Sequence, residues 1–218
     1  MDTIHNTVFF EQAKFLLYKK VIKWAKKIQK LYESEAYWSF CTGGRAYIFF
    51  FKKKYFYFLK RALTHFIDYV MTTMNIEAEA VEEARTKKNS IKGGFTKKIY
   101  ADIIGVKSTN TLDLAYFRDN NARYSEVFFY VDESETIEQC SKYVYFSCHK
   151  LVRDNVIGID SDPGFIVFYK ELNRGGYKYA VTEKLIEELT ELCEARTKVH
   201  SIEEIGDVYD ILALLQEL

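Results

Sequence analysis

The feature that most constrains this chain is a pair of consecutive helical patterns at its C-terminal end. Apolar periodicity predicts one helix over Tyr177–Arg196 and a second from Ser201 to Leu218. The apolar stripe of the first helix consists of Val181, Leu185, Leu189 and Leu192. That of the second covers more than half of the circumference and consists of Ile205, Val208, Ile211, Leu212, Leu215 and Leu218. The C-terminal region is therefore predicted to be all-α.

Four carboxylates fall on or beside these apolar stripes. Glu188 and Glu191 lie at the edge of the first stripe, and Glu204 and Asp207 lie inside the second. A carboxylate in an apolar setting costs several kcal/mol, so such a group takes up a proton or faces a cation. Four hard oxygen ligands suit Mg²⁺ or Mn²⁺, and the lack of His or Cys in this set argues against zinc.

Structural explanations compete with this hypothesis. Ser201 and Glu204 have the spacing of a capping box, in which Glu204 only caps its own helix. Glu188 and Glu191 could belong to a solvated helix face. Each histidine, including His200 before the second helix, is interpreted as a surface or capping residue. The occurrence of Glu-x-x-Glu and Glu-x-x-Asp on consecutive helices favours a site.

Three segments of the C-terminal region, 149–155, 188–191 and 204–207, together resemble one protein family. Glu188-x-x-Glu191 followed by Glu204-x-x-Asp207 resembles the metal motif of the all-α MazG-like and phosphoribosyl-ATP pyrophosphohydrolase-like nucleotide pyrophosphohydrolases. The segment 149–155, His-Lys-Leu-Val-Arg-Asp-Asn, is similar to the Lys-Leu-Val-Arg-Asp-Lys segment that opens one branch of that group. The resemblance covers residues 148–218, and Asn155 departs from the basic residue usual there.

The resemblance implies hydrolysis of a nucleoside triphosphate, or a related nucleotide, between the α- and β-phosphates. Mg²⁺ or Mn²⁺ is then expected on the four carboxylates named above, one glutamate doubling as the base that polarises water. Lys150 and Arg153 are expected to contact phosphates. Lys184 either joins them or simply pairs with Glu188 one turn along the helix. The family also implies a homodimer or a higher homo-oligomer.

The N-terminal region differs in composition from the C-terminal region. Residues 1–150 contain 24 basic and 17 acidic side chains, whereas residues 151–218 contain 7 and 14, although the whole chain is neutral. We therefore predict two domains, an α+β region over 1–146 and the helical domain over 147–218. In the first, we predict a helix along Phe10–Leu31, an aromatic hairpin with strands at 47–51 and 55–59, and a helix over 59–87. Strands are predicted at 97–104, 127–131, 143–146 and 165–169.

The first 60 residues contain 12 basic and 4 acidic side chains interleaved with aromatic residues. Such a surface can bind nucleic acid through phosphate contacts and base stacking. The lysines lie opposite the apolar stripe, however, which favours simple solvation of a helix. One alternative function is therefore a nucleic-acid-binding or protein-interaction module with an inactive helical dimerisation domain. Another is a structural protein whose helices pair with another chain.

The remaining features concern the compartment. No apolar run approaches the length of about 20 residues that a membrane span requires, and the N-terminus lacks the features of a signal peptide. Four scattered cysteines do not form a disulfide scaffold. We expect a cytoplasmic protein without a membrane partner.

Overall fold

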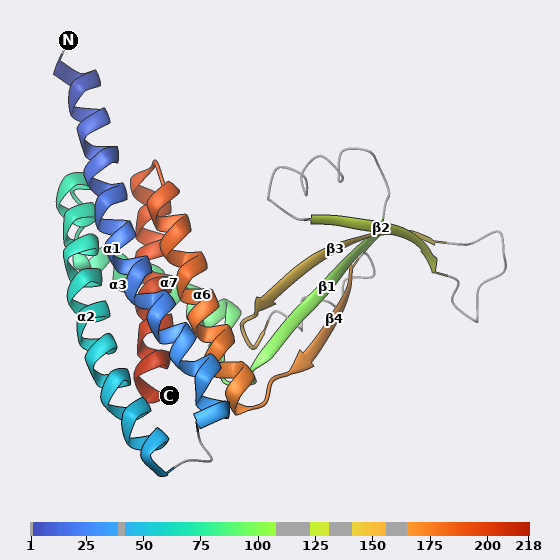
Figure 1. The fold of residues 1–218 in the computed structure, drawn as a ribbon. Coiled ribbons are helices and arrows are strands. Elements are labelled where there is room, and N and C mark those ends of the chain that lie inside the picture. The colour runs from blue at the N-terminus through green and yellow to red at the C-terminus, as the bar shows by residue number, and fades with distance from the viewer. Residues whose placement is uncertain (1, 39–41, 108–122, 131–140, 156–164) are drawn as a thin grey trace. The chain divides into compact units, whose positions relative to one another are not determined.

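The computed structural model describes residues 2–38, 42–107, 123–130, 141–155 and 165–218. The chain divides into two compact units, one helical and one built around a sheet (Figure 1). Residues 1–90 and 173–218 form the helical unit, and residues 91–172 form the sheet unit. The two ends of the chain therefore fold together, and the sheet unit is inserted between them in the sequence.

Long helices build the helical unit. They are α1 (Asp2–Trp38), α2 (Thr42–Met74), α3 (Ala78–Lys92, which ends just beyond the unit), α6 (Arg174–Glu194) and α7 (Lys198–Glu217). The last two confirm the helices predicted over 177–196 and 201–218, and each begins three residues earlier than predicted. The C-terminal region is thus helical, as expected.

The helices from the two ends of the chain share one core. α1 packs along α2 and α6, and α6 packs against α7. Fully buried side chains come from all four helices: Ile28, Leu59, Leu63, Phe66, Leu185, Leu189, Leu192, Ile205, Ile211 and Leu215. Helices α6 and α7 alone have too small a core for independent stability, and residues 1–90 supply the packing that they lack.

The connection between α6 and α7 is held from α1. Lys14 is fully buried, and its ammonium group donates a hydrogen bond to the carbonyl oxygen of Ala195 at 2.7 Å. Burial lowers the pKa of Lys14. Close by, the hydroxyl groups of Tyr18 and Thr190 are hydrogen-bonded at 3.1 Å. These polar contacts attach the C-terminal end of α6 to α1.

The aromatic hairpin predicted at 47–59 is wrong, because this segment lies within α2. Phe51, Tyr55 and Phe58 recur at spacings of four and three, which place them on one helix face. Trp24 of α1 stacks on Phe58 at 4.7 Å between ring centroids and tilts against Tyr55 at 5.9 Å. Aromatic enrichment favours strands, but here the packing against α1 decides for a helix.

The helix predicted over 59–87 is present as two helices. The chain breaks between α2 and α3 at Asn75, whose φ of 52° lies in the left-handed region. The N–H of Ile76 donates to the carbonyl oxygen of Met71 at 2.8 Å, so the end of α2 is capped. Asn is one of the few residues that adopt this conformation at low cost.

In its described residues, the sheet unit has four antiparallel strands. They are β1 (Ile99–Lys107), β2 (Arg123–Tyr130), β3 (Ser141–Leu151) and β4 (Phe165–Glu171), in the order β2-β3-β1-β4. β1 pairs with both β3 and β4. Each overlaps a predicted strand but differs from it in its bounds, and residues 1–146 combine helices and strands as expected.

The division into units differs from the boundary predicted near residue 147. Strand β4 follows that boundary in the sequence but pairs with β1, and α1 precedes it but packs on α6. Composition reports where charged and aromatic residues lie in the sequence, whereas the units arise from long-range pairing.

Among the described residues, no helix combines the length and apolarity of a membrane span.

Candidate metal centre

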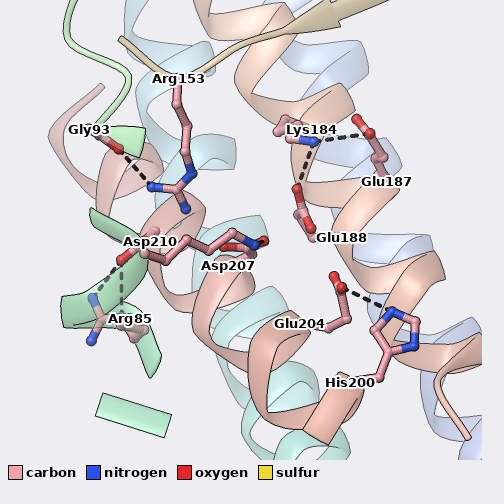
Figure 2. Close-up of polar contacts among 11 residues, drawn as sticks. Arg85, Gly93, Arg153, Lys184, Glu187, Glu188, His200, Glu204, Asp207 and Asp210 are labelled. Atoms are coloured by element: carbon pink, nitrogen blue, oxygen red, sulfur yellow. Dashed lines mark hydrogen bonds and ion pairs between the residues drawn. The ribbon is translucent and has the colours of Figure 1, made fainter. Parts of the chain in front are cut away.

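Helix α6 presents two of the predicted ligands one turn apart. Glu188 lies between the core residues Leu185 and Leu189, and only 3% of its surface is exposed. Glu191 follows on the same side of the helix and is exposed. The ammonium group of Lys184 lies 2.7 Å from Glu188 Oε1 and 3.0 Å from a carboxylate oxygen of Glu187 (Figure 2).

Helix α7 presents Glu204 toward the same place. The helix begins earlier than predicted, with Thr197 as the N-cap accepting from the N–H of His200. The predicted capping box is therefore wrong, and Ser201 is buried inside the helix. Glu204 has no terminal N–H to cap, and His200 Nε2 lies 3.2 Å from its Oε1 (Figure 2).

Glu188, Glu191 and Glu204 form one cluster, which we call the glutamate cluster. One carboxylate oxygen from each lies within 4.8 Å of the other two. Two members are buried, with Glu204 only 6% exposed, while Glu191 opens to solvent. One oxygen of Glu188 and one of Glu204 are buried with no hydrogen-bond partner among the described residues. Such atoms require a proton or a cation.

Asp207, the fourth predicted ligand, lies beside this cluster on α7. It is buried and forms an ion pair with Lys88 of α3. One turn away on α3, the guanidinium of Arg85 donates to Asp210 Oδ1 at 2.8 and 3.0 Å. Helix α3 thus brings two cations to α7.

The electrostatics of the cluster follow from burial and mutual repulsion. Burial, together with the negative charge of Glu188, raises the pKa of Glu204 to about 9. Burial also raises the pKa of Glu188, against the opposing effect of Lys184. Burial tends to lower the pKa of Lys184, but its pairing with Glu188 and Glu187 outweighs this and raises it. Glu204 therefore retains its proton at neutral pH unless a cation replaces it.

The donor set fits a hard divalent cation. All three ligands of the cluster are carboxylates, as Mg²⁺ and Mn²⁺ prefer. The two buried unpartnered oxygens are where such an ion would find ligands without breaking a hydrogen bond. His200 contacts Glu204 but is not part of the cluster, so the expectation against zinc is unchanged.

The two phosphate-binding residues expected near residue 150 belong to the sheet unit. Lys150 lies in β3 and is exposed. Arg153 donates from Nη1 to the carbonyl oxygen of Gly93 at 3.0 Å, and its guanidinium lies over the Phe95 ring at 4.7 Å. Asp154 accepts from Thr96 and Lys97, and these hydrogen bonds lower its pKa although burial opposes them.

Sequence reasoning missed three residues near the site. Lys88 and His200 contact predicted ligands, and Arg85 contacts Asp210 on α7, the helix that carries Glu204 and Asp207. Lys88 and Arg85 come from α3, more than 100 residues before α7, and no local spacing links them to it. His200 could have been found, because it precedes Glu204 by four residues on one helix face. It was interpreted instead as a residue in front of the helix, since the helix start was placed at Ser201.

No protein-family model, curated protein or solved structure matches the chain. The likeness to the nucleotide pyrophosphohydrolases therefore depends on the motifs quoted above and on the chemistry of the glutamate cluster.

Proposed function

We propose that the protein is a metal-dependent nucleotide pyrophosphohydrolase of the MazG-like kind, which cleaves a nucleoside triphosphate or related nucleotide between the α- and β-phosphates. The products are a nucleoside monophosphate and pyrophosphate. The observation that carries the proposal is the pair of buried, unpartnered carboxylate oxygens on Glu188 and Glu204. An apolar core tolerates such a pair poorly, so a cation-binding role accounts for both residues.

Glu188, Glu191 and Glu204 would hold Mg²⁺ or Mn²⁺, with Asp207 joining them after release from Lys88. A bound divalent ion supplies charge neutralisation at the phosphate oxygens and lowers the pKa of water. A glutamate of this set accepts a proton from the attacking water. The exposed position of Glu191 suits it for that role, because solvent reaches its carboxylate.

Two lysines of the helical unit are suited to contact phosphates. Lys184 and Lys88 each pair with a carboxylate that is proposed as a ligand. With those carboxylates holding an ion, the ammonium groups of Lys184 and Lys88 would be available to contact the anionic substrate. Lys150 and Arg153 remain phosphate contacts on the resemblance alone.

The test is pyrophosphate release from a panel of nucleoside triphosphates with Mg²⁺ or Mn²⁺. We expect the wild-type protein to release pyrophosphate from at least one of them, and only with metal. Glu188→Gln and Asp207→Asn should abolish turnover while circular dichroism shows an intact fold. Glu203→Gln is the matched control, because Glu203 is an exposed neighbour of Glu204 on α7.

Two outcomes would contradict the proposal. One is wild-type turnover in both Glu188→Gln and Asp207→Asn. The other is no pyrophosphate release from any nucleotide by a protein that nevertheless binds metal at the glutamate cluster. The second outcome would favour the inactive helical module considered above.

A further inference from the structure

Helices α1 and α2 carry a basic surface that the glutamate cluster does not use. Between Gln12 and Tyr32, α1 contains seven lysines and no acidic residue, and α2 has no acidic residue from Thr42 to Ile67. Lys14 is buried, and the other six lysines of α1 lie within about a third of the helix circumference. Five of these six are exposed: Lys19, Lys20, Lys23, Lys26 and Lys30.

A continuous row of aromatic rings lies beside these lysines and joins the two helices. It consists of Trp24 from α1 and four residues of α2, Phe51, Tyr55, Phe58 and Tyr57. Consecutive ring centroids are 5.5 Å apart from Phe51 to Tyr55, 5.9 Å from Tyr55 to Trp24, 4.7 Å from Trp24 to Phe58 and 5.5 Å from Phe58 to Tyr57. The first four are half-buried, while Tyr57 is 61% exposed.

Cations lie directly over this row. The ammonium group of Lys27 is 4.4 Å from the ring centroid of Trp24 and 5.4 Å from that of Tyr55. Lys23 lies over Trp24 and Lys54 over Phe51, each at 5.9 Å. The lysines therefore do more than solvate the outer face of α1, because α2 brings aromatic rings into contact with them.

We propose that this basic aromatic surface binds single-stranded nucleic acid. A single strand offers both groups that the surface can recognise, phosphates for the lysines and unstacked bases for the rings. A duplex offers phosphates and the base edges in its grooves but no free base faces, since its bases are stacked within the helix. The ring of Tyr57 is 61% exposed and can therefore accept a base directly. No residue of α6 or α7 takes part, so the proposal is independent of the hydrolase activity.

The full-length protein is titrated against fluorescent oligo(dT) and oligo(U) of about 15 nucleotides, near the largest site size of one single-strand-binding domain. A duplex of the same length and anionic phosphatidylserine vesicles are the competing ligands. We expect both single strands to bind more tightly than the duplex. Binding should weaken as salt rises, with a slope that increases by about 0.7 for each phosphate contact.

Two variants separate charge from stacking. Lys23→Gln combined with Lys27→Gln and Lys54→Gln should lower the salt slope by about 2. Tyr57→Ala should weaken binding about fivefold or more without changing that slope, whereas Tyr57→Phe keeps the ring and should bind like wild type.

The charge control removes three lysines elsewhere, by Lys87→Gln, Lys92→Gln and Lys170→Gln. All three lysines are exposed, and none belongs to the basic aromatic surface. This triple variant has the same net charge as the test variant and should bind like wild type. Circular dichroism checks that both triple variants fold.

The proposal is overturned if no single strand binds at low salt, or if the duplex binds equally well. Preference for the vesicles would assign the surface to a membrane instead. Equal losses in the two triple variants would show that net charge alone accounts for binding.

Discussion

The carboxylates of Glu188 on α6 and Glu204 on α7 approach each other in a buried space, and each keeps one oxygen without a hydrogen-bond partner among the described residues (Figure 2). A proton on Glu204 satisfies the pair by donating to Glu188. A divalent cation satisfies it by taking the place of that proton. The two possibilities respond oppositely to pH and to metal, which makes them separable by experiment.

Glu204→Gln should stabilise the metal-free protein at alkaline pH. The pKa of Glu204 is about 9 in the folded protein, above its ordinary value of 4.5. Between these values the folded state binds more protons than the unfolded state, so the free energy of unfolding falls as pH rises. Glutamine stays neutral and avoids this loss. We expect a gain of about 1 kcal/mol or more at about pH 8, or roughly 2–4 °C in Tm, and almost none at about pH 5.

Thermal melts in the presence of a chelator measure this difference. Glu203→Gln serves as the control, because Glu203 is exposed on the same helix and its loss should leave Tm unchanged at both pH values. A Glu204→Gln variant that melts below wild type at alkaline pH would show that the carboxylate is stabilised where it lies.

Mg²⁺ or Mn²⁺ should raise the Tm of the wild-type protein. A ligand at 100 times its Kd adds about 2.7 kcal/mol to the free energy of unfolding. The ion displaces the proton retained by Glu204, so metal affinity should rise between about pH 6 and 9 and protons should be released on binding. Isothermal titration calorimetry in buffers of different ionisation enthalpy measures both effects. The same Tm rise in a Glu188→Gln, Glu204→Gln double variant would place the ion elsewhere.

Much of the helical site was predictable because its signal is local. Glu188 and Glu204 were found from apolar periodicity, since a carboxylate inside an apolar stripe stands out without any knowledge of the fold. The start of α7 was placed too late, because Ser201 and Glu204 match a capping box that the true N-cap, Thr197, supersedes. That single error assigned His200 to the wrong environment.

The remaining features depend on contacts between distant segments. Lys88 reaches Asp207 only because α3 packs beside α7, and nothing within either segment indicates this. The aromatic run near Tyr55 has the composition of a strand, and its helical state follows from stacking on Trp24. Composition likewise gives no sign that the sheet unit is inserted between α3 and α6, because this arrangement follows from the pairing of β4 with β1.

Lys150→Ala should raise KM for the nucleotide and change kcat little. The resemblance assigns Lys150 to the substrate phosphates, and a hydrogen bond to a charged group contributes about 1.5–3 kcal/mol, which corresponds to roughly 10-fold or more in KM. Lys150 is exposed in β3, so its truncation should not disturb folding. Lys170→Ala in β4 is the matched control. Identical KM values in wild type and Lys150→Ala would remove this residue from the site.

The protein should form a homodimer or a higher homo-oligomer. Besides the resemblance, large apolar side chains remain exposed near the start of α1, including Phe9 at 76% and Leu16 at 60%. Such side chains are suited to an interface between copies of the chain. Light scattering should give at least twice the monomer mass of 25.7 kDa, and Phe9→Ser with Leu16→Ser should reduce it. An active monomer at micromolar concentration would contradict this expectation.

Gly206→Ala tests whether the side chain of Arg85 on α3 needs the space left by the glycine on α7. A Cβ atom at Gly206 would lie 2.7 Å from Cγ of Arg85, closer than van der Waals contact allows. Alanine gains about 1 kcal/mol in helix propensity, but overpacking costs about 1–3 kcal/mol and displaces Arg85 from Asp210. We therefore expect a net loss of stability in the wild-type background. In an Arg85→Ala background the obstruction is gone, and the same substitution should stabilise the protein by about 1 kcal/mol.

A double-mutant cycle of thermal melts measures this reversal of sign. Equal effects in both backgrounds would show that a methyl group fits beside Arg85, and that the approach of α3 to α7 does not depend on this glycine.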